Sequence, residues 1–213
     1  MSSKVFGFIG IESYDLVHAL GSVITALGCN AILVDNSEDG ALACTVPYGM
    51  DNGTVVNYYG VDVARFIDAD EFRDEYEYII LYLGADCEDG SAQDCDEVYL
   101  VTDYQKHNIQ KLLNVSLKDE QCRYLIYRDR IAAKIDLSYL QEVLSPLGIN
   151  DETSYMITES QNDYDNMVML QYDSVVPKFS VSQSAQELIT DILNVDFNSK
   201  NILAAIKSLS RRK

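Results

Sequence analysis

The chain has 213 residues, of which 47% are hydrophobic, so one compact domain with a core of its own is expected. Lys and Arg number 16 and Asp and Glu number 34, which gives a formal net charge of −18. This charge argues against a general DNA or RNA binder, because phosphate contacts need a basic surface. The ordinary apolar content, with 15 Tyr and 6 Phe, argues against disorder.

Two features of the sequence predict a cytoplasmic protein. No apolar run is long enough to cross a bilayer, and the N-terminus lacks the long apolar region and cleavage site of a signal peptide. The cysteines are odd in number and scattered, which is typical of reduced thiols. They are Cys29, Cys44, Cys87, Cys95 and Cys122.

The first 35 residues have the pattern of a β-α-β unit. An apolar strand over 4–9 leads into a turn at Gly10, and an apolar stripe with helical spacing runs through 16–27 until Gly28. A second apolar strand follows at 31–35. The pattern therefore predicts two parallel strands joined by a right-handed crossover.

The remainder of the chain continues this alternation of strands and helices. The expected strands are 78–83, 98–102, 123–127, 154–158 and 167–171, with one short strand within 36–60. The expected helices are 61–75, 104–114, 137–145, 183–194 and 199–211. The fold class predicted is α/β, a single doubly wound, mostly parallel sheet with helices on both faces. The domain spans 1–196, and 197–213 forms a basic amphipathic C-terminal helix of the same domain.

The turn after the first strand is the first place to look for a ligand, because such folds bind ligands at the carboxyl ends of their strands. A phosphate-binding loop needs several glycines, a Lys, and a Ser or Thr for Mg²⁺. The turn from Ile9 to Asp15 has Gly10 as its only glycine, two acids (Glu12 and Asp15) and no Lys. These acids would repel a triphosphate by several kcal/mol per pair at an effective dielectric of about 20. Ser13 or Asp15 is expected to cap the helix that follows.

The order of segments resembles the MinD/ParA family of deviant Walker A ATPases, a branch of the P-loop NTPases. The resemblance covers nearly the whole chain, although most of it is hydrophobic pattern. It is carried by VHALGSVITALG (17–28) with AILVD (31–35), YEYIILY (76–82), DEVYLVT (96–102), YLIYR (124–128) and LQYD (170–173). The resemblance implies a P-loop NTPase-like fold.

Four positions depart from what the family needs. On this resemblance the phosphate-binding Lys falls on Ser13, the Mg²⁺-binding Thr on Tyr14, the Walker B Asp on Tyr82 and the adenine-reading Asn on Tyr127. The matching positions are Asp35, Arg128 and Asp173. The degenerate site thus comprises Gly10, Glu12, Ser13, Tyr14, Asp35, Tyr82, Tyr127 and Arg128. The departures predict a pseudo-ATPase with no catalytic residue and no cofactor.

Within the family, the chain resembles the TadZ/CpaE group, whose phosphate loops are degraded. The resemblance implies an adaptor or localisation factor for a bacterial pilus or secretion assembly, acting through protein partners and as a homodimer. The tyrosines on the former nucleotide face are expected to form that dimer interface, because interfaces are rich in aromatic residues. The alternatives are a nucleotide-binding ATPase or sensor that retains ATP with Mg²⁺, and a small-molecule binder of flavodoxin-like type.

Several residues have two interpretations. Asp35 is either a capping acid at a strand end or a remnant switch acid. Tyr14 and Tyr82 either fill the space of a nucleotide or complete the core. The acidic segment 86–97 is a solvated loop rather than a cation site, because its spacing matches no metal motif. His18 and His107 are expected to be surface or edge residues, since neither lies near a nucleophile motif.

The C-terminal segment 197–213 differs in charge from the rest. It has no acid and five basic residues, so the remainder of the chain carries −23. Three interpretations stay open: a peripheral contact with anionic lipid, a helix docked on its own domain, or a contact with an acidic partner surface. The contact residues would be Lys200, Ile202, Leu203, Ile206, Lys207, Leu209, Arg211 and Arg212.

Overall fold

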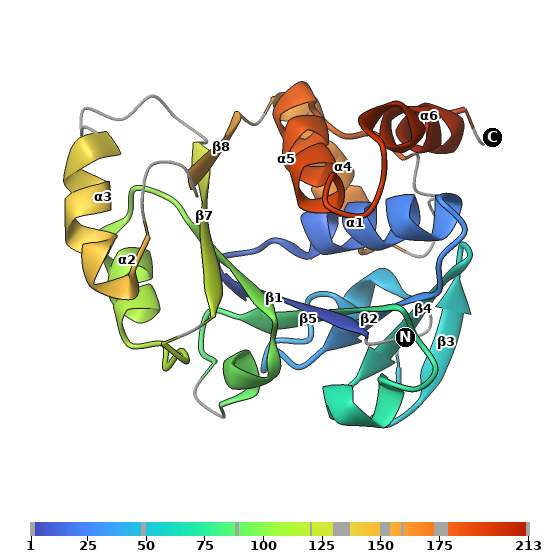
Figure 1. Cartoon of the computed structure of the whole chain (residues 1–213), viewed down its shortest axis with the longest axis horizontal. Coiled ribbons are helices and arrows are strands. Elements are labelled where there is room, and N and C mark those ends of the chain that lie inside the picture. The colour runs from blue at the N-terminus through green and yellow to red at the C-terminus, as the bar shows by residue number, and fades with distance from the viewer. Residues whose placement is uncertain are drawn as a thin grey trace.

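The sheet runs through the centre of the molecule (Figure 1). The computed structural model describes residues 3–47, 50–87, 90–119, 121–129, 137–149, 154–158, 160–172 and 179–211. Within them, eight strands form one sheet in the order β3-β4-β2-β5-β1-β6-β7-β8. The strands are β1 Lys4–Gly10, β2 Ala31–Asp35, β3 Val55–Tyr58, β4 Val61–Arg65, β5 Tyr78–Gly84, β6 Glu97–Thr102, β7 Cys122–Asp129 and β8 Ser154–Thr158. The β3–β4 pairing is antiparallel, and the other described pairings are parallel.

Helices cover both faces of the sheet. The helices are α1 Tyr14–Ala26, α2 Lys106–Leu113, α3 Leu137–Leu144, α4 Gln161–Met169, α5 Gln183–Leu193 and α6 Ser199–Leu209. Apolar side chains of α1, α5 and α6 share one core cluster, and those of α2 and α3 share a second cluster on the other face. Figure 1 shows α5 and α6 layered over α1. The predicted α/β doubly wound sheet is therefore confirmed.

The two core clusters follow from side-chain alternation along the central strands. Phe8 of β1 and Tyr82 of β5 belong to the cluster under α1, whereas their neighbours Ile9 and Leu81 belong to the other cluster. Successive residues of a strand point to opposite faces, so a strand covered on both sides needs a continuous apolar run. The run from Tyr78 to Leu83 meets this need.

The helix predicted over 61–75 is wrong. Residues 61–65 form β4, which pairs in parallel with β2, and only a short 3₁₀ helix, η2 (Ala69–Phe72), follows. Val61 and Val63 alternate with Asp62, which is a strand pattern at the sheet margin. Phe66 fitted helical spacing but lies exposed at the end of β4.

The strand predicted over 167–171 is also wrong, because this segment belongs mostly to α4. The helix begins with a capping box in which the Ser160 hydroxyl accepts from the Asp163 backbone N–H and the Asp163 side chain accepts from the Ser160 N–H. A Ser followed three residues later by an acid is a helix-start signal. The apolar run Met167–Leu170 resembles a short strand, which led to the wrong prediction.

His18 does not lie on the surface as predicted. It is buried on α1, with its ring edge-on to Tyr58 of β3 at 6.2 Å between ring centroids. Its Nδ1 lies 3.5 Å from the Ser22 hydroxyl, and its Nε2 has no hydrogen-bond partner among the described residues. Burial lowers its pKa to about 4. His107 is exposed on α2, as predicted.

Candidate functional site

The first turn closes tightly onto a neighbouring strand. Gly10 has a φ of +125°, and a Cβ there would lie 1.9 Å from the carbonyl oxygen of Val101 on β6. The Ile11 backbone N–H donates to that same carbonyl at 3.0 Å. Only glycine tolerates both this backbone conformation and this close approach. The backbone after β1 therefore packs directly against β6, which leaves no room there for a phosphate-binding loop.

Ser13 stands at the N-cap of α1 but does not cap it with its side chain. Its carbonyl accepts hydrogen bonds from the backbone N–H groups of Leu16 and Val17. The Ser13 hydroxyl is fully buried and has no hydrogen-bond partner within the described part of the chain. The position that the resemblance assigns to a phosphate-binding Lys thus holds a short side chain shielded from solvent.

A cation reaches the first turn from a distant strand. Arg128 of β7 has a side chain that is only 2% exposed, and its guanidinium donates to both carboxylate oxygens of Asp15 at 2.7 and 2.8 Å. It also donates to the backbone carbonyl of Glu12 at 2.5 Å. A bidentate pair of this kind is among the stronger polar contacts in proteins. The charge of Arg128 is therefore neutralised inside the chain, where it fixes the turn.

Tyr14 and Tyr82 are core residues at the same end of the sheet. Tyr82 lies between Phe8 of β1 and Asp35 of β2 in the strand register, and only 1% of its surface is exposed. The Tyr14 hydroxyl donates to the Met167 carbonyl at 3.1 Å. Burial raises the pKa of both phenols well above the ordinary value, and nearby acids raise it further. Both side chains are neutral and enclosed, so the expectation that they form an exposed dimer interface is wrong.

Tyr127 lies on the opposite face of the sheet from Tyr82. Its ring stacks on Tyr104 at 6.1 Å between centroids and packs in the core cluster under α2. Burial raises its pKa, and its hydroxyl has no hydrogen-bond partner in the described residues. The structure therefore does not bring Tyr127 together with the other degenerate-site positions.

Asp35 organises the loop that follows β2. It is fully buried and accepts from the Ser37 N–H at 3.0 Å, the Ser37 hydroxyl at 2.5 Å and the Ala43 N–H at 2.6 Å. Burial raises its pKa, while these hydrogen bonds act in the opposite direction. This set of donors agrees with the capping interpretation of Asp35, because its oxygens are occupied by the backbone and hydroxyl of its own loop.

These residues do not fit a magnesium-bound triphosphate. The turn supplies no Lys, the Ser13 hydroxyl is enclosed, and Arg128 is already paired with Asp15. Tyrosines occupy the positions where the resemblance places the Mg²⁺-binding Thr and the Walker B Asp. Among the described residues, no group of three or more His, Cys, Asp or Glu side chains is arranged to hold a metal ion.

The C-terminal helix α6 is docked on its own domain. The side chains of Ile202, Ile206 and Leu209 are buried in the core cluster that contains α1 and α5, whereas Leu203 is exposed. Its described basic residues are all exposed, namely Lys200, Lys207 and Arg211. Arg212 and Asp173 lie outside the described residues. None of the described helices is long and apolar enough to cross a membrane.

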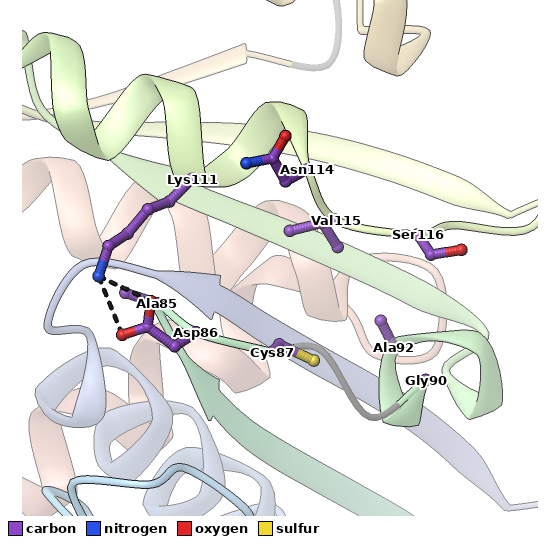
Figure 2. A pocket seen from close by; sticks show the side chains of 9 residues that line it. All are labelled: Ala85, Asp86, Cys87, Gly90, Ala92, Lys111, Asn114, Val115 and Ser116. Atoms are coloured by element: carbon purple, nitrogen blue, oxygen red, sulfur yellow. Dashed lines mark hydrogen bonds and ion pairs between the residues drawn. The ribbon is translucent and has the colours of Figure 1, made fainter.

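A pocket of about 250 Å³ lies on the other face, beside the acidic segment (Figure 2). In its described residues, the connection from β5 to β6 contains no α-helix, only the short 3₁₀ helix η3 (Ser91–Asp94), and the pocket lies between this connection and the end of α2. Lys111 crosses from α2 to pair with Asp86 at 2.7 Å. The described residues that line the pocket include none from the first turn. Lys111, the one basic residue among them, is already paired with Asp86.

The comparisons with known proteins support the fold. No family model and no curated protein matches the chain. A ParA family ATPase from Chlorobium tepidum TLS matches over 98% of each chain with 14% identity and a TM-score of 0.59. A chain of the MinC:MinD cell division protein complex from Aquifex aeolicus matches over 99% of this chain and 97% of that one, with 15% identity and a TM-score of 0.61. The chain therefore has the P-loop NTPase-like fold of ParA and MinD, which at this identity says nothing of activity.

Proposed function

We propose that this chain is a non-catalytic relative of the ParA and MinD ATPases that acts through protein contacts, as an adaptor or localisation factor. The observation that carries the proposal is the ion pair between the buried Arg128 and the half-buried Asp15. A P-loop holds the nucleotide phosphates with backbone N–H groups and with a Lys that is free to meet the anion. Here the guanidinium at the first turn is engaged by Asp15 and by the Glu12 carbonyl, and the turn itself has no Lys or Arg.

A nucleotide could use Arg128 only by displacing Asp15. Breaking a fully buried pair costs about 3–5 kcal/mol, and this pair costs somewhat less because the Asp15 side chain is 18% exposed. The acids Glu12 and Asp15 would then face the phosphates. Together these costs weaken ATP binding by at least about a hundredfold relative to a site with a free cation.

Protein, rather than nucleic acid or nucleotide, is the proposed partner. The net charge of −18 disfavours nucleic acid, and one protein of similar fold was solved in a complex of MinC with MinD. The resemblance to the TadZ/CpaE group makes a bacterial pilus or secretion assembly the proposed setting. The exposed basic side chains of α6 would supply a second contact, to an acidic protein or an anionic membrane surface. The apolar residues of α6 would stay in the core.

The test is direct measurement of nucleotide binding to the full chain. Isothermal titration and thermal unfolding are followed with Mg·ATP, Mg·GTP and their diphosphates, and an active P-loop ATPase is titrated in parallel. We expect no saturable heat and no rise in the melting temperature at submillimolar nucleotide. Saturable binding, with or without hydrolysis, would replace the proposal with a nucleotide-binding ATPase or sensor.

A further inference from the structure

The β3–β4 hairpin leaves one edge of the sheet open. β3 is the terminal strand, and among the described strands only β4 pairs with it. An edge strand presents a row of outward N–H and C=O groups that can pair with another chain. Proteins usually protect such an edge with Lys, Pro or a bulge. The four residues Val55–Tyr58 include neither Lys nor Pro.

This edge is also uncharged, in a chain that is strongly acidic elsewhere. Residues 52–61 contain no charged side chain, and Asp51 is the only charged residue between 40 and 61. Residues 52–60 are exposed or half-buried. The strand at the opposite edge, β8, is bordered in the sequence by Asp151, Glu152 and Glu159.

The tip of the hairpin holds an aromatic residue in a costly conformation. Tyr59 and Gly60 form the two-residue turn between β3 and β4, with φ values of 52° and 86°. Asn-Gly or Gly-Gly is the usual choice for such a turn, and a bulky residue there is strained. Tyr59 is nevertheless 53% exposed, and Val55 at the other end of β3 is 41% exposed. Exposed aromatic residues kept at a cost in stability are typical of contact surfaces.

Charge identifies the occupant that fits this edge. In a two-fold symmetric contact, each surface meets a copy of itself. Any acidic surface of this chain would therefore meet an equally acidic surface and be repelled. The uncharged β3 edge avoids this repulsion, and its outward backbone groups are complementary to those of an identical antiparallel strand.

We propose that β3 pairs antiparallel with β3 of a second copy, so that the two sheets join across a two-fold axis. Val55 and Tyr59 lie at the contact, while Val56 and Tyr58 remain packed on their own core. The edge is only one short strand, so the pairing closes as a dimer and leaves no further copy of that edge exposed. The proposal does not depend on the proposed function, since it involves neither the first turn nor a nucleotide.

The first experiment measures self-association of the full chain without nucleotide, by sedimentation equilibrium from micromolar to submillimolar protein. We expect a reversible dimer that tightens as NaCl is raised, because salt screens the long-range repulsion between two copies of charge −18. A monomer throughout, a dimer that weakens with salt, or a dimer that needs Mg·ATP would each overturn the proposal. A salt-weakened dimer would point to an ionic contact such as that of the α6 bases with an acidic surface.

The second experiment compares two matched edge variants. Val55→Asp places a charge on β3, and Met156→Asp places the same charge on β8, where the native side chain is 42% exposed. Like charges brought together across paired strands are destabilising, so we expect Val55→Asp to weaken the dimer by roughly tenfold. We expect Met156→Asp to leave it unchanged. Equal dissociation constants for the two variants would overturn the assignment to β3.

Circular dichroism and thermal unfolding check that both variants fold. If Val55→Asp does not fold, hydrogen exchange of the native chain decides the question. Amides of residues 55–58 should then become more protected as protein concentration rises. Protection that is independent of concentration would overturn the proposal.

Discussion

The first turn and the β3–β4 hairpin border one sheet, but they differ in how their polar groups are paired. At the first turn, Arg128 satisfies Asp15 and the Glu12 carbonyl from within the chain, and Gly10 closes the backbone onto β6. At the hairpin, β3 and its turn carry no charged side chain, and the outer edge of β3 has no partner strand among the described residues. A region whose polar groups are already paired gains little from a ligand, whereas an open edge gains hydrogen bonds when it is covered.

This contrast also separates fold from function. The place where proteins of this fold class bind ligands is the carboxyl edge of the sheet. In this chain the buried side chain of Tyr82 occupies that edge, and Arg128 pairs there with Asp15 of the first turn. The proposed contact surface lies at the lateral edge of the same sheet. Three variants would break or sharpen this comparison, in descending order of expected effect.

The largest effect is expected from Arg128→Met, which removes the positive charge of the side chain and keeps much of the side-chain volume. Because Asp15 would lose its buried partner, we expect the free energy of unfolding to fall by about 3 kcal/mol, measured by urea denaturation. The matched control is Arg73→Met, since Arg73 pairs with Asp70 at the surface. That change should cost less than about 1 kcal/mol. Equal losses for the two variants would show that the first turn is not held by its ion pair.

The next effect is expected at acid pH and comes from His18, which packs edge-on against Tyr58 of the hairpin. Burial lowers the pKa of His18 to about 4 from an ordinary value of 6.5. As the pH falls from 6.5 to about 4, the unfolded chain therefore binds a proton that the folded chain does not. Its contribution to stability is present above pH 6.5 and is lost through this window, on the order of 3 kcal/mol.

Denaturation across this pH range should then be less pH-dependent in His18→Phe than in the native chain. The control is His107→Phe, because His107 is exposed on α2. If both variants keep the native pH dependence, carboxylates alone account for it and His18 is not the titrating group.

The smallest effect on stability is expected from Tyr59→Asn, at the tip of the hairpin. Asn adopts the left-handed conformation more easily than Tyr, so we expect the unfolding free energy to rise by about 0.5 kcal/mol. Self-association should weaken in the same variant, measured by sedimentation. Tyr139→Asn is the control, since Tyr139 is similarly exposed but on helix α3. A more stable variant that still associates normally would show that Tyr59 has no contact role.

Local patterns gave most of the fold but not every element. The strands β1, β2 and β5 are short continuous apolar runs, and the helix α1 carries a clear 3.6-residue apolar period. A helix was predicted over 61–75 because Val63, Phe66 and Phe72 fit helical spacing, but residues 61–65 form the strand β4, which pairs with β2. Tertiary context overrides a weak local preference of this kind.

The degenerate site was predictable in part. The sequence shows that the first turn lacks a Lys and carries two acids. It does not show that Arg128 would neutralise Asp15, because 113 residues separate them and no local spacing links them. It also does not show that Tyr82 and Tyr127 face opposite sides of the sheet, since that depends on the register of β5 and β7.

By itself, the sequence determined the α/β class, the acidic charge and the absence of a Lys from the first turn, because periodicity, composition and residue identity are local properties. Only the tertiary structure decided that Arg128 is already paired, that the tyrosines are enclosed and that an uncharged strand forms the sheet edge. Those outcomes depend on strand order and register, which bring distant segments into contact. Contacts between segments that are far apart in the chain decide these outcomes, and such contacts cannot be read from a short stretch of sequence.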